Sequence, residues 1–302
     1  MERAFLFEGL GIGDLAVFYR YFAQDFTFRE LSISLSRRLG VNIPAALLRP
    51  DRKDIWLYNQ LYTCMCDILL CQWLRSNHVK PDLVAGHSLG VYPALHAAGA
   101  ISIPAALDLV SGIHALLKRM SKETFVSCVV VAQSLEILRK TILAKSQADK
   151  PVYVATINTA KQAVITGPKQ DVAAIFSYFH DSSELAAKTI SLPYPVHTPY
   201  IAPLKAELRA LIASTPIQTA NIPIISTLDQ QAITHADDVR VFILQHLYTP
   251  VHWLNTVQTL KHRAAFFDIG MRYYIAKLMF WIDKKSKCHI MKQILANNFE
   301  RI

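Results

Sequence analysis

One serine in this chain has neighbours that could make it a nucleophile. The segment Gly86-His87-Ser88-Leu89-Gly90 follows a short apolar stretch and precedes another. A serine hydroxyl is a weak nucleophile near neutral pH, so it needs a neighbouring base and amide donors for the oxyanion. A tight turn between a strand and a helix would expose the hydroxyl and direct the Leu89 amide into the site. Ser88 is therefore a candidate nucleophile, and a serine that only caps a helix is the alternative.

The strand-to-helix context that this motif requires is predicted around Ser88. Residues 82–85, which are apolar from Leu83 onward, predict a buried strand, and residues 89–98 predict a helix. Residues 4–7 predict another buried strand, which leads into a glycine-rich turn at 9–13, and residues 55–76 predict a helix with an apolar stripe. These elements favour an α/β fold with a parallel sheet.

The middle of the chain has a different order of elements. We expect a strand at 125–131, a helix at 134–144, strands at 153–158 and 162–166, a helix at 170–179 and a strand at 187–192. This β-α-β-β-α-β order is typical of a ferredoxin-like subdomain. After it, a strand at 222–227, a helix at 237–247 and a strand at 265–269 resume the α/β pattern. We therefore predict an α/β-hydrolase-like catalytic domain of residues 1–122 and 193–302, with residues 123–192 inserted as a ferredoxin-like subdomain.

Composition bounds the class of protein. The 302 residues are 52% hydrophobic, enough for a sizeable core. The first residues lack the apolar region of a signal peptide, and no apolar run is long enough for a membrane span, so we expect a cytoplasmic protein. The five cysteines form no CxxC pair, and the eleven histidines form no HExxH motif. We therefore expect no metal site and no disulfide.

The charge of the chain favours an anionic partner. Its formal net charge is +9 and its pI is about 9.3. Lysines and arginines are scattered apart from the run at 284–287, and no basic stripe is interleaved with aromatic residues, which disfavours nucleic acid. The charge alone does not choose among a phosphorylated cofactor, a membrane surface and an acidic protein.

Several further motifs carry a resemblance to a known family. "FLFEGLGIG" looks like "FxFPGQGSQ", and "NQLYTCMCDILLCQWLRSNHVKPDLVAGHSLG" resembles a glutamine-bearing helix followed by a nucleophile strand. "INTAKQAVITG", "PYPVHTPYIAPL" and "HLYTPVHW" follow in the same order. Together they resemble the malonyl-CoA:acyl-carrier-protein transacylase family, the acyltransferases of fatty acid and polyketide synthesis, over nearly the whole chain.

The resemblance implies a role for individual residues. Ser88 corresponds to the nucleophile and His197 to its base, for which a satisfied core histidine is the alternative. In this family a backbone carbonyl holds the second nitrogen of the base, and the matching residue is His246, where glutamine is usual. Backbone amides of Leu10 and Leu89 would form the oxyanion hole, although Leu10 stands where the family has glutamine. The implied substrate pocket contains His87, Ile113, Leu117, Asn158 and Val196, and His87 is as well explained by packing alone.

One departure from the family bears on the substrate. Members that transfer malonyl groups carry an arginine in "LVxxRGxxM" that binds the free carboxylate as a bidentate pair. Ile113 stands at that position, and Arg119 lies about 240° further around the helix. A buried carboxylate facing Ile113 would lose its partner at a cost of roughly 3 kcal/mol or more. We therefore expect an apolar acyl group in place of malonyl.

Two enzymatic functions and two weaker alternatives follow from the resemblance. The first is hydrolysis of stalled acyl groups on acyl carrier protein, as in the arginine-lacking proofreading acyl hydrolases of polyketide pathways. The second is transfer of an acyl group between thioester carriers. A non-catalytic carrier-binding relative and a generic α/β-hydrolase esterase are less favoured. In each enzymatic case the acyl group arrives on the phosphopantetheine of an acidic acyl carrier protein or on CoA. We expect a monomer with no bound cofactor and no contact with nucleic acid or membrane.

Overall fold

The computed structural model describes residues 1–10, 26–39, 55–120, 125–181, 188–190, 194–270, 272–291 and 293. The strands of the described part are β1 (Glu2–Phe7), β2 (Leu83–Gly86), β3 (Phe125–Val131), β4 (Tyr153–Ile157), β5 (Gln162–Pro168), β6 (Lys188–Ile190), β7 (Ile224–Ile225), β8 (Ala232–Ile233), β9 (Ala264–Ile269) and β10 (Cys288–Ile290). The helices are α2 (Phe26–Leu39), α4 (Ile55–Ser76), α5 (Val91–Ala97), α6 (Ile103–Lys118), α7 (Leu135–Lys145), α8 (Lys169–Asp181), α9 (Lys205–Ser214), α10 (Ala236–Tyr248), α11 (Trp253–Leu260) and α12 (Tyr274–Ile282), and short 3-10 turns span Ser88–Gly90 and Pro199–Leu204.

The larger sheet is parallel apart from one edge strand. Its order is β10-β9-β1-β2-β7-β8, and only β8 runs antiparallel to its neighbour. Strand β1 lies between β2 and β9, with Phe7 opposite both Gly86 and Ile269. The carboxyl ends of these three strands therefore meet at one edge, where ligand sites of α/β sheets form. The predicted α/β class with a parallel sheet is confirmed.

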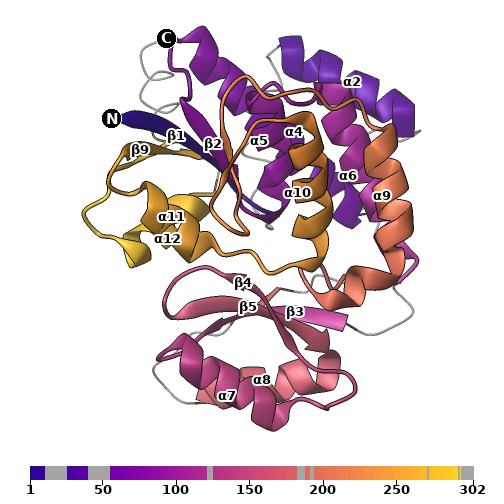
Figure 1. Cartoon of the computed structure of the whole chain (residues 1–302), viewed down its shortest axis with the longest axis vertical. Helices are drawn as coiled ribbons and strands as arrows, with labels where there is room; N and C mark the ends of the chain where they lie inside the picture. The colour runs from indigo at the N-terminus through magenta and orange to yellow at the C-terminus, as the bar shows by residue number, and fades with distance from the viewer. Residues whose placement is uncertain are drawn as a thin grey trace.

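Alternating side chains of β1 divide the core into two layers. Phe5 and Phe7 join the cluster that contains residues of α4, α5, α6, α9 and α10. Ala4 and Leu6 face the other side, where they join residues of α11 and α12. The alternation follows from the pleat of a strand that is buried on both faces. The sheet is thus covered on both sides by helices (Figure 1).

A second, four-stranded sheet lies beside the first one. Its antiparallel order is β4-β5-β3-β6, and helices α7 and α8 cover the face that points away from the main sheet (Figure 1). It has its own apolar core, centred on β3, β5 and the two helices. Backbone hydrogen bonds of Val251 connect the second sheet to the rest of the molecule. The Val251 amide donates to the Ala155 carbonyl of β4 at 3.0 Å, and the Val251 carbonyl accepts from the Ile157 amide of β4 at 2.8 Å.

The elements between 125 and 190 follow one another as β-α-β-β-α-β. The predicted domain boundaries at 122/123 and 192/193 lie outside the described residues, as do residues 11–13 of the predicted glycine turn and the ends of the strand predicted at 187–192. The division into a catalytic domain and an inserted ferredoxin-like subdomain stays a prediction.

Two glycines allow the turn after β2 to pack against the end of β1. A Cβ on Gly86 would collide with the backbone of Gly90 and Val91. A Cβ on Gly90 would collide with the carbonyl of Phe7 and lie 2.7 Å from the carbonyl oxygen of Glu8. Since backbone atoms cannot move aside as a flexible side chain can, both positions require glycine for steric reasons.

We predict that Gly90→Ala destabilises the fold by about 1–3 kcal/mol, because the added methyl group overpacks a rigid contact. Gly112→Ala in α6 is the matched control, since the atoms nearest to its Cβ would be side-chain carbons of Leu211, two of them at 2.8 and 2.9 Å, and no backbone atom. Alanine is also favoured over glycine inside a helix. Urea unfolding measures both variants, and equal stability of the two would contradict the steric account.

Candidate active site

Ser88 lies at the carboxyl end of β2, where the chain turns into a helix. Its φ is 55°, in the left-handed region that residues with a Cβ seldom adopt. The 3-10 turn at Ser88–Gly90 leads directly into α5, so the strand, the turn and the helix occur in the predicted order. Strained residues of this kind persist where the surrounding structure holds them. In this conformation Ser88 borders the pocket described below.

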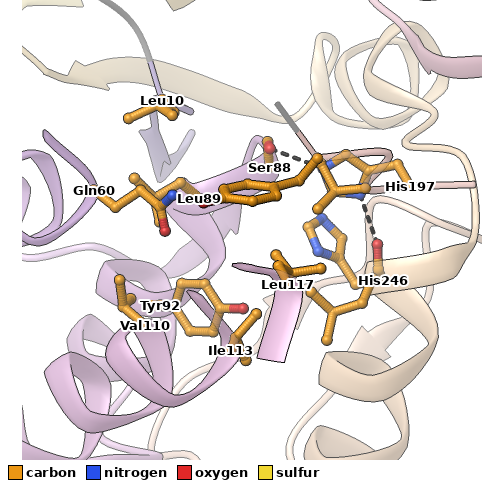
Figure 2. A pocket seen from close by; sticks show the side chains of 13 residues that line it. Leu10, Gln60, Ser88, Leu89, Tyr92, Val110, Ile113, Leu117, His197 and His246 are labelled. Atoms are coloured by element: carbon orange, nitrogen blue, oxygen red, sulfur yellow. Dashed lines mark hydrogen bonds between the residues drawn. The ribbon is translucent and has the colours of Figure 1, made fainter. Parts of the chain in front are cut away.

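The Ser88 hydroxyl meets a histidine that is 109 residues away in the sequence. Ser88 Oγ lies 2.8 Å from His197 Nε2 (Figure 2). His197 follows β6 and precedes the 3-10 turn at Pro199–Leu204, and its own φ of 62° is also left-handed. Two strained residues thus face each other across the site. The distance is that of a serine hydroxyl donating to a neutral imidazole.

The second ring nitrogen of His197 is held by the backbone. His197 Nδ1 lies 2.7 Å from the carbonyl oxygen of His246, and the His197 amide donates to the Leu247 carbonyl at 2.7 Å. Both carbonyls belong to the last turn of α10, where helical carbonyls lack intrahelical partners. Because a carbonyl only accepts, Nδ1 carries the proton and Nε2 is free to accept from Ser88. The negative end of the helix dipole also stabilises a positive charge on this ring.

Burial keeps His197 neutral. Desolvation lowers the pKa of His197 to about 4, the hydrogen bond to the His246 carbonyl opposes this shift, and the nearby His87 adds to it. The His246 ring, 4.7 Å from that of His197, also has its pKa lowered by burial. A neutral His197 can take a proton from Ser88 over a wide pH range.

A pocket extends from Ser88 along one face of α6. Val110, Ile113 and Leu117 have helical spacing and line it together. Figure 2 shows Ile113, Val110 and Tyr92 at the end away from the Ser88–His197 pair. The cavity volume is about 70 Å³, and its lining is Leu10, Gln60, Ser88, Leu89, Tyr92, Val110, Ile113, Leu117, Tyr194, Val196, His197, His246 and Leu247.

No arginine or lysine belongs to this lining among the described residues. Ile113 is buried, as predicted for a residue that forms an apolar wall. Arg119 instead pairs with Glu207 at 3.3 Å on the surface, where its side chain is 61% exposed. Lys118 is exposed as well. Neither cation takes the place of an arginine at position 113.

The two residues expected to supply oxyanion amides both border this pocket. Leu89 follows Ser88 directly, and Leu10 follows the end of β1. Gly9 packs so closely on the nucleophile that a Cβ there would lie 3.1 Å from the Ser88 Cβ. The part of the predicted turn beyond Leu10 lies outside the described residues. The donor roles of the two amides stay a prediction.

Two residues expected in the pocket, His87 and Asn158, are not among the residues that line it, and for His87 this fits the packing alternative. His87 and Asn158 are buried behind the nucleophile, where His87 Nε2 donates to Asn158 Oδ1 at 2.9 Å. The Thr156 hydroxyl also donates to Asn158 Oδ1, and the Asn158 amide donates to Gln162 and Tyr274. Polar groups that are fully buried need such partners, and these bonds turn both side chains away from the cavity. They join the nucleophile turn to the second sheet.

Sequence reasoning missed part of the pocket lining, namely Gln60, Tyr92, Val110, Tyr194 and Leu247. Gln60 lies on the helix that carries the glutamine of the family pattern, so that match was an available signal. Gln60 Nε2 is 3.3 Å from His114 Nδ1, and the His114 ring packs edge-on against Tyr194. Periodicity alone does not separate pocket residues from core residues of the same helices, because both are apolar.

The described residues also lack membrane-spanning helices, clusters of metal ligands and disulfides. No helix among them is long and apolar enough to cross a membrane. Nowhere in the described ranges do three or more histidine, cysteine, aspartate or glutamate side chains gather as metal ligands would. None of the five cysteines, all of which lie in the described ranges, forms a disulfide.

Comparison with known proteins finds similarity over most of the chain. A family model described as "acyl transferase domain" matches residues 59–271. The malonyl CoA-acyl carrier protein transacylase of Bacillus subtilis is 22% identical over 289 residues, which cover 94% of this chain and 91% of that protein. The bikaverin polyketide synthase bik1 of Gibberella fujikuroi is 26% identical over 273 residues, which cover 88% of this chain but only 13% of that much longer protein.

Solved structures show the same fold. The malonyl CoA-acyl carrier protein transacylase of Coxiella burnetii superposes with a TM-score of 0.88 at 23% identity, covering 98% of this chain and 97% of that one. A chain from the complex of a type II polyketide synthase acyl-carrier protein with its malonyl-transacylase gives a TM-score of 0.87 at 22% identity, covering 99% and 100%.

The lowered pKa of His197 predicts an unusual pH profile for acylation of Ser88. Since the base works when unprotonated, a pKa of about 4 keeps it active as the pH falls well below 6.5. We expect the burst of p-nitrophenol from p-nitrophenyl acetate to keep its pH 7 rate at pH 5.5. His197→Ala should slow this burst by about 10²–10⁴-fold. An acid limb with its midpoint near pH 6.5 would show that the base is not held in this buried, neutral state.

Proposed function

Because the chain belongs to the acyl transferase domain family, we propose that it transfers an acyl group from one thioester carrier to another through an acyl-Ser88 intermediate. The observation that carries the proposal is the 2.8 Å hydrogen bond between Ser88 Oγ and His197 Nε2 at the mouth of an apolar pocket. A module that only binds carrier proteins would need neither the nucleophile nor the base.

In the first half-reaction, Ser88 Oγ attacks the thioester carbonyl while His197 Nε2 takes the hydroxyl proton. The negative charge that develops on the carbonyl oxygen is stabilised by the amides of Leu10 and Leu89. Collapse of the tetrahedral intermediate breaks the carbon–sulfur bond, and His197 returns its proton to the departing thiolate. The acyl group is then an ester of Ser88.

In the second half-reaction, a carrier thiol attacks this ester. His197 takes the thiol proton, the carbon–oxygen bond to Ser88 breaks, and the serine recovers its proton from His197. The His246 carbonyl holds the Nδ1 proton throughout, in the position that a carboxylate occupies in many serine hydrolases. A neutral acceptor suffices here because the imidazolium also lies at a helix carboxyl end.

The acyl group that fits this pocket has no free carboxylate. Ile113 and its neighbours Val110 and Leu117 offer apolar contact, and a malonyl carboxylate would be buried without a cation. Such a loss costs roughly 3 kcal/mol or more. The cavity of about 70 Å³ suits a short chain, since one water-sized group takes about 10–15 Å³ on this measure.

Transfer is favoured over hydrolysis as the fate of the acyl-enzyme. The similar proteins carry the names of transacylases and of polyketide synthases, and one solved relative is a malonyl-transacylase in complex with an acyl-carrier protein. The presence of Ile113 in place of arginine suggested a proofreading hydrolase. This residue contacts the acyl group, however, and does not determine whether water or a thiol attacks the acyl-enzyme. Hydrolysis of stalled acyl groups is therefore the second candidate.

The proposed partner is an acidic acyl carrier protein that presents the acyl group on phosphopantetheine. The net charge of +9 favours its approach, because opposite charges steer association. The phosphopantetheine arm would deliver the thioester to Ser88, so the chain itself needs no resident cofactor for this chemistry.

Transfer and hydrolysis predict different products. We expect that wild-type protein given acetyl-loaded carrier protein and an unloaded second carrier forms acetylated second carrier faster than free acetate, because a thiol attacks an ester more readily than water does at neutral pH. Mass spectrometry of both carriers and quantification of acetate measure the ratio. Release of acetate at the same rate with and without the second carrier would support the hydrolase instead.

Ile113→Arg tests the assignment of the pocket. Wild-type protein should form acyl-enzyme from acetyl or butyryl thioesters and discriminate strongly against malonyl thioesters. The arginine variant should shift this preference toward malonyl, in part only, because a guanidinium also needs supporting hydrogen bonds. Leu117→Met, which changes the same wall without adding charge, is the control. Efficient malonylation of the unmodified protein would overturn this reading of Ile113.

A further inference from the structure

An ion pair between the half-buried Arg272 and the buried Glu8 joins the ends of the two adjacent strands β1 and β9. Arg272 Nε donates to Glu8 Oε1 at 3.0 Å, and the side chains are 20% and 2% exposed. Glu8 follows β1 directly, and Arg272 lies shortly after the end of β9. Gly270 makes room for the pair, since a Cβ there would collide with the Glu8 side chain. An ion pair of this kind forms only where the surrounding structure brings both groups together.

The same arginine also binds the backbone of the loop that follows β1. Arg272 Nη2 donates a hydrogen bond to the Gly9 carbonyl. The guanidinium therefore binds the side chain of one residue and the main chain of the next. The last strand contact before this point is the bond from the His87 amide to the Phe7 carbonyl at 2.9 Å. Beyond it, Arg272 contacts the main chain at Gly9, one residue before Leu10.

Gly9 lies between the turn that carries Ser88 and a residue that lines the pocket, so the position of its peptide affects the site. Gly9 packs on His87 and Ser88, with a built Cβ only 2.8 Å from the His87 carbonyl oxygen and 3.1 Å from the Ser88 Cβ. Leu10, the next residue, lines the pocket that contains Ser88 and His197. A shift of the Gly9 carbonyl would therefore rotate the peptide that bears the Leu10 amide.

Both members of the pair depart from the family pattern that the chain resembles. Glu8 stands where "FxFPGQGSQ" has proline. Residues 270–272 read Gly-Met-Arg where the family usually has Gly-Pro-Gly, so Arg272 replaces the second glycine of that segment. A third departure, Leu10 in place of glutamine, removes the usual polar anchor from the same loop. The contacts of Arg272 connect these three departures from the family pattern. The proline and the glutamine of the pattern are absent from the loop, and the Arg272–Glu8 pair contacts the loop at Glu8 and Gly9.

We propose that Arg272, with Glu8 as its counterion, is a positioning residue that fixes the Gly9–Leu10 peptide so that the Leu10 amide points at the oxyanion. The assignment rests on the proposed acyl-enzyme chemistry at Ser88. Arg272 does not touch the substrate in this account and acts only through the loop. Its removal should therefore reduce the rate of acylation and leave ground-state binding nearly unchanged.

Because several carboxylates are buried around Arg272, a useful variant must not leave them without a cation. Asp67 and Asp268 are also buried nearby, and burial together with the charge of Glu8 raises the pKa of both carboxyl groups. Removal of Arg272 alone would leave Glu8 without its cation and would destabilise the fold for that reason. The double variant Glu8→Gln/Arg272→Met removes both charges at nearly constant volume.

The experiment compares this double variant with wild type in two measurements. The first is the p-nitrophenol burst from p-nitrophenyl acetate, which reports on Ser88 and its oxyanion hole whichever thioester the protein uses. We expect the maximal rate to fall about ten- to a hundredfold with little change in the half-saturating concentration. The second is amide hydrogen exchange in a peptide ending at Leu10, which should become faster. Arg272→Lys keeps the charge but not the two-point contact, and it should give an intermediate rate.

A second arginine–glutamate pair provides the matched control. Arg119→Met/Glu207→Gln makes the same two changes at the exposed pair beside α6 and should leave the burst and the exchange at wild-type values. If Glu8→Gln/Arg272→Met folds and both the burst rate and the exchange at residues 8–10 equal those of this control, the proposal is overturned. It is also overturned if only binding weakens.

The same measurements distinguish failure of the proposed transfer function from failure of the proposal for Arg272. If wild type gives a burst with p-nitrophenyl acetate but does not pass acetyl groups between carriers, the transfer function fails while the comparison of variants stands. If wild type gives no burst, the acyl-enzyme chemistry fails, and with it the role of Arg272 in positioning the oxyanion donor, even where the exchange measurement shows that Arg272 holds the loop.

Discussion

The hydrogen bond between Ser88 and His197 is the constraint on which the rest of the site depends. It joins two residues that are 109 positions apart, and both have left-handed backbones. Such conformations cost of order 1–3 kcal/mol each and require support from the surrounding fold. The support comes from Gly86 and Gly90, which let the nucleophile turn pack on β1, and from the end of α10, which holds His197 at its amide and at Nδ1.

The main chain supplies most of the polar chemistry at this site. His197, the proposed base, is oriented by a carbonyl, and the expected oxyanion donors are amides, so side chains can change at these positions without loss of the donor or acceptor. This explains how His246 and Leu10 replace glutamines of the family pattern while the arrangement around Ser88 persists. The pocket wall is different, because there the side chain itself is the contact. Under the proposed function, Ile113 would therefore change which acyl group fits, and not whether Ser88 is activated.

Much of the fold could be predicted from the sequence, because local patterns specify it. Short runs of apolar and β-branched residues predicted β1, β2, β3 and β9 within two residues of their observed ends, and the glycines around Ser88 marked the turn. The placement of His87 and Asn158 could not be predicted, since a hydrogen bond between residues 71 positions apart depends on how the second sheet docks. The contact of Arg272 with Glu8 and Gly9 was missed for the same reason: it depends on β1 and β9 being neighbours, which no local pattern reveals.

The measurement that most directly tests this account is peptide mapping by mass spectrometry after a brief reaction with acetyl-loaded acyl carrier protein. If Ser88 is the nucleophile and the pocket accepts a carboxylate-free group, the acetyl group will be found on the peptide that contains Ser88. It will be absent from Ser88→Ala, which should keep its fold because only one hydroxyl is lost. Acetylation of another residue at the same rate in both proteins, or preferential labelling of Ser88 by malonyl-loaded carrier protein, would contradict the account.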